Sequence, residues 1–510
     1  MRMRAGDAAR VLGAIARHHE LELVSGDEVV LDALIARGLV RAAPEPGPER
    51  ARLDALRAEL AAVGRVRAAR PDDPTLGAEE RRLRTEILER SEEVARSEGA
   101  TVLRARGGGP YRGVVGPAAR VQITQRGRAL MTDLEPRTWR SAELTLDAFD
   151  AEMAALRALL DRRAARAAAI LAHARARDRL GPAPSAALVG LSVLRAEPPV
   201  IARVLDAALT RLAPLDAAQP GAAAAGAECL CLASADLTVV ERPHVTDGLM
   251  ADVRELTSRF GVAFEDALDA AALLSHLPRE AREARLALAF ELASAMRVRG
   301  RAVSLAFALL AVSGESSVPA HLPAQLAALD DELAPEVSGA PERMATAVLL
   351  LASKYERQAQ IRRWRTLRQY LARVSPDGMS VEAALLAWLA LPVEEILHDL
   401  RLASQALGRH GVAGTGAETV AVASKLLLSM AAMAAGAEGD PEERLALAPL
   451  ASPALELVGL GGALAALPLA ALSAFHRTVL CAATAWEEVH HPTHSGYVYG
   501  GYRPRGHYRG

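Results

Sequence analysis

The sequence predicts a mainly α-helical protein, in which a small α+β unit at the N-terminus precedes a long, solenoid-like array of α-helical repeats. Three observations support this fold class. Hydrophobic residues make up 51% of the 510 residues and aromatic residues only 3%, so the core is built from Ala and Leu, the strongest apolar helix formers. Strand-like runs stand out only within the first 135 residues. Leucine pairs then recur at intervals of about 35 to 42 residues, enough for two helices and two turns.

The first unit is predicted to span residues 1–135. Apolar residues at helical spacing indicate helices, and β-branched runs bounded by glycine and proline indicate strands. We expect three helices at residues 7–18, 28–37 and 125–134, and two strands at 101–106 and 120–124.

Two segments of this unit resemble a winged-helix domain: LDALIARGLV at residues 31–40 and VQITQRGRALM at residues 121–131. In that family a helix ends in a Gly-Leu-Val step into a strand, and the wing returns through a strand-to-helix junction of the form I-T-x-x-G-x-x-L. An insertion at residues 44–99 separates the two segments. Its density of Arg, Glu, Leu and Ala predicts a helical hairpin that turns at residues 70–74.

The rest of the chain is predicted to be helical. We expect a long connecting helix at residues 141–180, helical repeats at 183–435 and hydrophobic helices at 440–489. One helical hairpin cannot bury its apolar face alone, so the repeats would stack on one another. The recurring leucines are therefore predicted to be buried where helices meet: Leu273, Leu274, Leu350, Leu351, Leu385 and Leu386.

Charge and targeting signals narrow the function classes. The 60 basic and 62 acidic residues nearly cancel, so no overall field selects for nucleic acid or an anionic membrane. Three cysteines and the absence of a secretory signal predict a cytoplasmic protein. Residues 457–475 form a 19-residue run without charge that just reaches the length of a membrane span. Its Ala and Gly content and Pro468 favour buried helices instead.

Motifs for catalysis are absent from the sequence. There is no phosphate-binding loop, no H-E-x-x-H, no G-x-S-x-G and no spaced Cys/His cluster. The sequence therefore favours a non-enzymatic protein, and predicts no catalytic, cofactor-binding or metal-binding residues.

Arginines of the wing and of a helix near residue 365 are the candidate contacts for nucleic acid. These are Arg104, Arg106, Arg112, Arg120, Arg126, Arg128, Arg362, Arg365 and Arg373. Helical geometry places Trp364 on the face opposite the arginines, which predicts a core anchor. Acidic residues at 330–336 could neutralise the patch, and the candidate recognition helix at 26–38 is itself acidic.

The last 21 residues, 490–510, predict a flexible tail in which His, Tyr and Arg alternate with Gly. Its candidate interaction residues are His490, His491, His494, Tyr497, Tyr499 and Tyr502. The sequence as a whole favours a scaffold or adaptor that binds a protein or peptide partner. The alternatives are a winged-helix regulator that binds nucleic acid through its basic residues, and a membrane-associated scaffold that uses residues 457–475.

Overall fold

A computed structural model shows a mainly helical chain that divides into two compact units, Met1–Ala151 and Glu152–Gly510. The predicted C-terminal helices and tail lie outside the residues that the structure describes. Those residues are 3–17, 20–23, 26–42, 48–69, 74–97, 100–105, 120–137, 142, 144–174, 189, 191–192, 196–218, 222–233, 237–275, 277, 279–312, 315–352, 356–373, 379–389, 391–412 and 417–434.

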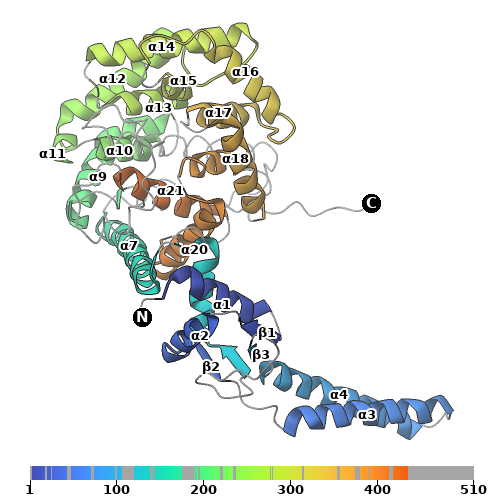
Figure 1. The fold of residues 1–510 in the computed structure, drawn as a ribbon. Helices are drawn as coiled ribbons and strands as arrows, with labels where there is room; N and C mark the ends of the chain where they lie inside the picture. Colours follow the sequence, from blue (N-terminus) through green and yellow to red (C-terminus); the bar gives the residue numbers. More distant parts are fainter. Residues whose placement is uncertain are drawn as a thin grey trace. The chain divides into compact units, whose positions relative to one another are not determined.

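The first unit contains a four-stranded sheet in the order β1-β3-β4-β2 (Figure 1). Its strands are β1 (Glu20–Leu23), β2 (Val40–Ala42), β3 (Ala100–Ala105) and β4 (Arg120–Ile123). β2 and β3 both pair with β4 in antiparallel fashion, and β1 pairs with β3 in parallel. The two predicted strands are present as β3 and β4. β1 is not among the predicted strands, because its four residues show too short a pattern to identify alone.

Helices α1 (Ala5–Arg17), α2 (Asp27–Ala36) and α5 (Gln125–Leu134) complete the first unit, and a 3₁₀ turn follows at Glu135–Arg137. They correspond to the three helices that the sequence predicts there. α1 packs against α2, α5 and the sheet, and buries Leu12 and Ile15. The core of this unit is therefore a small helix-on-sheet layer.

The junction between β4 and α5 depends on a threonine and a glycine. The Thr124 hydroxyl caps α5 by accepting a hydrogen bond from the Gly127 N–H at 3.1 Å. The backbone N–H of Thr124 donates to the Leu39 carbonyl at 3.0 Å, and its hydroxyl lies 2.8 Å from the Gly38 carbonyl. A Cβ at Gly127 would lie only 2.1 Å from the Leu39 oxygen. The glycine is required because two backbone segments meet there.

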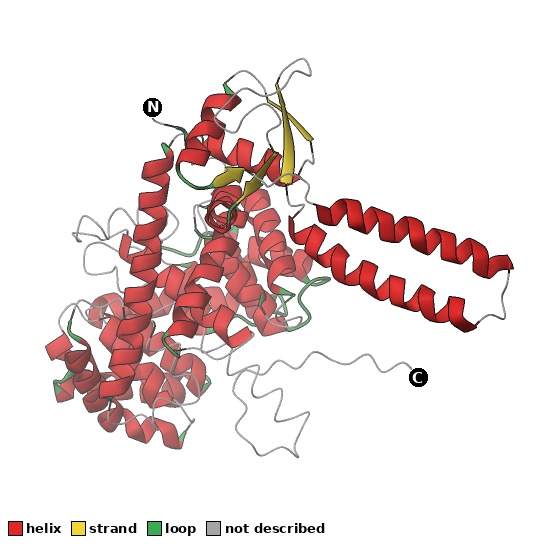
Figure 2. Ribbon diagram, turned by 90° about the horizontal axis from the view of Figure 1, so that it is seen from below, coloured by secondary structure: helices red, strands yellow, loops and turns green. Residues whose placement is uncertain are grey.

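The insertion between β2 and β3 is a pair of long helices, which we call the helical arm. The arm consists of α3 (Pro48–Ala69) and α4 (Pro74–Ser97). The two helices lie side by side (Figure 2) and pack on each other, and no other described element packs on either to a comparable extent. Leu56 and Leu83 are buried in the arm.

The connecting helix α7 (Leu146–His173) begins in the first unit and continues into the second. Its buried side chains Phe149, Met153, Leu156 and Leu160 follow the helical spacing that the sequence shows. The helix ends before residue 180.

Within the described residues, the second unit consists mainly of six successive helix pairs, which follow one another along the chain (Figure 1). We call the first helix of each pair outer and the second inner. The outer helices are α9 (Pro198–Leu212), α12 (Pro243–Phe260), α14 (Arg279–Val298), α16 (Leu322–Leu333), α18 (Arg357–Leu371) and α20 (Val393–Arg409). The inner helices are α10 (Ala222–Ala233), α13 (Phe264–Leu274), α15 (Leu305–Ala311), α17 (Ala340–Ala352), α19 (Ser380–Leu386) and α21 (Ala417–Ala434). Short helical segments at Ala213–Ala217 (η3) and Leu237–Val240 (α11) complete the unit.

The inner helices pack against one another in sequence and form the core. Residues 305–310 of α15, 344–350 of α17 and 421–430 of α21 are buried without interruption. A helix buried on every side must be apolar on every side, which explains the Ala- and Leu-rich runs. Within the described part of residues 185–435, no strand occurs.

The leucine prediction is confirmed at five of its six positions. Leu273, Leu274, Leu350, Leu385 and Leu386 are buried on inner helices. The prediction is wrong for Leu351, which is half-buried. This residue lies in the last turn of α17, where the helix leaves the packed layer.

Candidate functional site

The arginine-rich helix α18 has one apolar face and one charged face. Trp364 is completely buried with Leu367, and its indole N–H donates to the Ser380 carbonyl at 2.9 Å. The predicted role of Trp364 as a core anchor is therefore confirmed. A side chain held in this way offers no ring for stacking with a base.

Acidic side chains at the end of α16 and just after it neutralise part of the charged face of α18. Arg365 Nε lies 2.7 Å from a Glu336 carboxylate oxygen, and Arg357 lies 3.2 Å from Glu332. Arg362 and Arg373 are exposed, and the Arg373 guanidinium lies 4.8 Å from the ring centre of Tyr370. Of the three candidates near residue 365, Arg365 is thus paired with an acidic side chain, whereas Arg362 and Arg373 are exposed.

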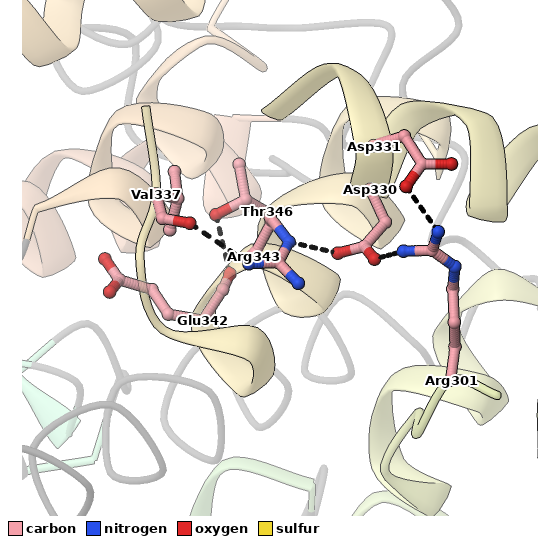
Figure 3. A network of polar contacts seen from close by, with 7 residues as sticks. All are labelled: Arg301, Asp330, Asp331, Val337, Glu342, Arg343 and Thr346. Carbon is pink, nitrogen blue, oxygen red and sulfur yellow. Dashed lines mark hydrogen bonds and ion pairs between the residues drawn. The ribbon is translucent and has the colours of Figure 1, made fainter. Parts of the chain in front are cut away.

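The neighbouring acids Asp330 and Asp331 have other partners (Figure 3). Arg301 contacts both aspartates, and Arg343 Nε lies 2.6 Å from Asp330. Arg343 also donates to the Val337 carbonyl at 3.2 Å. Asp330 is therefore a buried carboxylate held between two guanidinium groups, and Glu332 and Glu336 are the acids that pair with arginines of α18. Only the tertiary structure reveals this division.

The wing arginines are only partly described. Arg104 lies in β3 and Arg120 begins β4, with side chains outside the described part, and Arg106 and Arg112 lie outside it altogether. Arg126 and Arg128 are exposed on α5, and Arg126 contacts the Arg37 carbonyl at 3.4 Å. The structure thus places two of the six wing candidates at the surface of the first unit.

The candidate recognition helix α2 presents an acidic and apolar surface. Asp27 is buried and lies 2.6 Å from Arg10 of α1. This contact raises the pKa of Arg10, chiefly through its hydrogen bond to Asp27. Glu28 and Val29 are exposed on the other side. A carboxylate and an isopropyl group at this position do not complement phosphate or base edges.

Three buried charged residues of the inner helices have no counterpart in the sequence-based predictions. Lys425 of α21 lies 2.5 Å from Glu228 of α10, and both side chains are buried. Glu382, in the first turn of α19, is 5% exposed. Burial, with a smaller contribution from the Glu342 carboxylate, raises the pKa of Glu382 to about 8. Glu382 thus holds a proton at neutral pH.

The described residues contain no group of three or more His, Cys, Asp or Glu side chains that could hold a metal ion. No helix in the described ranges is long and apolar enough to cross a membrane. Residues 457–475 and the tail candidates lie outside those ranges, at His490, His491, His494, Tyr497, Tyr499 and Tyr502.

Comparison of the chain with protein-family models, with curated proteins and with solved structures finds no match.

Proposed function

We propose that the protein is a scaffold or adaptor that binds a protein or peptide partner in the cytoplasm. The helical arm carries this proposal. At 1.5 Å per residue, the 22-residue α3 extends about 33 Å. An arm of this length, with little packing on the rest of its unit, is well suited to contact a partner.

The surface of the arm supports this role. Val66 is 47% exposed near the tip, among charged side chains of both signs. Glu80 pairs with Arg67 and Arg84, and Arg82 lies 3.2 Å from Glu86. Water screens ion pairs at the surface of a helix, so such pairs contribute little to stability. The arm therefore adds little to the stability of its own unit, and partner binding accounts for its length.

We also propose the finer architecture: a winged-helix-like first unit and a solenoid-like second unit of helical repeats. The Thr124–Gly127 junction supports the former, since it joins the two segments that carry the resemblance. The six successive helix pairs support the latter. Two of the outer helices, α14 and α20, begin directly after a Leu-Pro step, at Leu277 and Leu391.

A nucleic-acid-binding regulator is the second candidate, and two observations weigh against it. Glu332 and Glu336 pair with arginines of α18, and α2 exposes Glu28 where a DNA-reading helix would offer a cation. The observation in favour of this alternative is that Arg126 and Arg128 on α5 are exposed.

The decisive experiment replaces residues 48–97 with a six-residue Gly/Ser linker. β2 and β3 flank β4, so Ala42 and Ala100 lie about 10 Å apart, two strand spacings, and the six-residue linker alone reaches about 20 Å. Full-length and linker proteins are used to capture partners from an extract of the native host. We expect the partner to be captured by the full-length chain and lost with the linker. The control Arg203→Ala, which breaks an exposed ion pair of the second unit, should retain it.

Nucleic-acid binding is measured by fluorescence anisotropy with random-sequence duplex DNA near physiological salt. We expect no binding by the full-length protein. Submicromolar affinity that disappears when Arg106, Arg112 and Arg120 are all changed to Ala would replace the scaffold proposal with the regulator. A captured set that is unchanged by the linker would also refute the role of the arm.

A further inference from the structure

The inner helices form a continuous series whose ends meet. α10 packs on α13, α13 on α15, α15 on α17, α17 on α19, and α19 on α21. The first and last of these helices are joined by Lys425 and Glu228, which are 197 positions apart in the sequence. The Lys425 Nζ lies 2.5 Å from Glu228 Oε1, and the two side chains are 4% and 7% exposed. The series thus returns to its starting point.

A second contact joins the two ends at the surface. Asp161 of α7 lies 2.9 Å from Arg409, at the end of α20, and 3.2 Å from His410. The hydrogen bond from Arg409 is the main cause that lowers the pKa of Asp161, so this carboxylate stays charged. Because the contact is exposed, it contributes little to closure.

We propose that the six helix pairs close into a ring. The contact between α10 and α21, which we call the seam, is the place where this ring opens, and the Lys425–Glu228 ion pair holds the seam closed. The backbones of successive inner helices approach closely, whereas those of α10 and α21 approach less closely. Two long side chains bridge the remaining gap. Among the described residues, apolar packing holds the other junctions, and the Lys425–Glu228 ion pair links the two helices at this one.

The presence of lysine at position 425 indicates that the size and shape of the cationic group matter at the seam. The chain has only two lysines, Lys354 and Lys425, and every other basic residue is arginine. A lysine ends in one compact ammonium group, whereas an arginine carries a planar fork that needs more space and several acceptors. The seam accommodates the ammonium group against one carboxylate. Lys425→Arg therefore keeps the charge and loses the fit.

The two partners depend on each other because both are buried. Removing one partner of a buried ion pair is strongly destabilising, whereas replacing both with apolar side chains is often neutral. Loss of Lys425 alone should therefore open the seam, and simultaneous loss of Glu228 should close it again. A merely peripheral contact would not show this reversal.

Cys231 provides a reporter that the protein already contains. It lies three residues after Glu228 on α10, on the same helix face, and is completely buried. Burial raises the pKa of its thiol to about 12, and the Glu228 carboxylate adds to this. Alkylation of Cys231 therefore requires exposure of the seam.

The experiment measures the rate of iodoacetamide alkylation at Cys231 by peptide mass spectrometry in the full-length protein. The variants are Lys425→Met, Lys425→Arg and the double variant Lys425→Met with Glu228→Leu. We expect alkylation to be about tenfold faster or more in both single variants, and close to the wild-type rate in the double variant. The matched control is Arg343→Met, which removes a half-buried cation paired with Asp330 on α16, away from α10 and α21, and should leave the rate unchanged.

Hydrogen exchange of the wild-type protein provides a test that needs no variant. We expect amides of α10 and α21 to exchange faster than those of α13, α15, α17 and α19, because the ring opens at the seam. Equal exchange in all six inner helices would overturn the proposal. So would an unchanged Cys231 rate in Lys425→Met, or an equal acceleration in Arg343→Met, which would indicate general unfolding.

Discussion

Replacing Glu382 with Gln should remove a pH dependence from the stability of the second unit. The folded-state pKa of Glu382 is about 8, whereas its ordinary value is 4.5. The folded protein therefore keeps a proton that the unfolded chain loses between these values. The stabilisation is complete below pH 4.5 and is lost as the pH rises through 8. Because Gln does not titrate, Glu382→Gln abolishes this loss.

The size of the effect follows from linkage. One pKa unit corresponds to about 1.4 kcal/mol, so the Glu382 contribution falls by about 2 kcal/mol between pH 6 and pH 8. Other groups that titrate in this interval do so equally in both proteins. The difference between wild type and Glu382→Gln therefore isolates this carboxyl group.

Urea unfolding at pH 6, 7 and 8, followed by tryptophan fluorescence, measures the free energy of unfolding. Trp364 and Trp388 report on this region, since both are buried beside α19. Glu356→Gln is the control. Its carboxylate is exposed, and N–H groups of the first turn of α18 lower its pKa, so it titrates well below pH 6. Parallel curves for wild type and Glu382→Gln would refute the buried, protonated state of Glu382.

Four further substitutions test the packing. Gly127→Ala should destabilise the first unit by about 3 kcal/mol in thermal unfolding, because the new Cβ would lie 2.1 Å from a backbone oxygen. As a control, Gly64→Ala in the arm, where a Cβ meets no other atom, should stabilise the protein by up to about 1 kcal/mol. Trp364→Phe should cost about 1 to 3 kcal/mol in urea unfolding, since the buried Ser380 carbonyl loses its donor, and an unchanged midpoint would contradict that hydrogen bond. Asp266→Ala removes the carboxylate that accepts hydrogen bonds from the first two N–H groups of α15, at 2.6 and 3.0 Å. Hydrogen exchange of these two amides should become about tenfold faster, and amides that stay protected would show that the cap is dispensable.

Local patterns of the sequence were sufficient to predict the helices, the arm and the face of α18 that buries Trp364. Each depends on residues within a few turns of one another: the spacing of apolar side chains, the charge pattern of the arm and the 100° rotation per residue in α18. The buried leucine pairs follow for the same reason. Leu351 departs from the pattern because its burial depends on where α17 leaves the packed layer.

The polar contacts were decided by the tertiary structure alone. Lys425 pairs with Glu228, which lies 197 positions away in the sequence. Asp330 pairs with Arg301 and Arg343, although the arginines of α18 follow it closely in the chain. No periodicity carries such pairings, because they depend on which helices the fold brings together. The raised pKa of Glu382 likewise arises from burial, which is a property of the assembled inner helices and not of the residues beside it in the sequence.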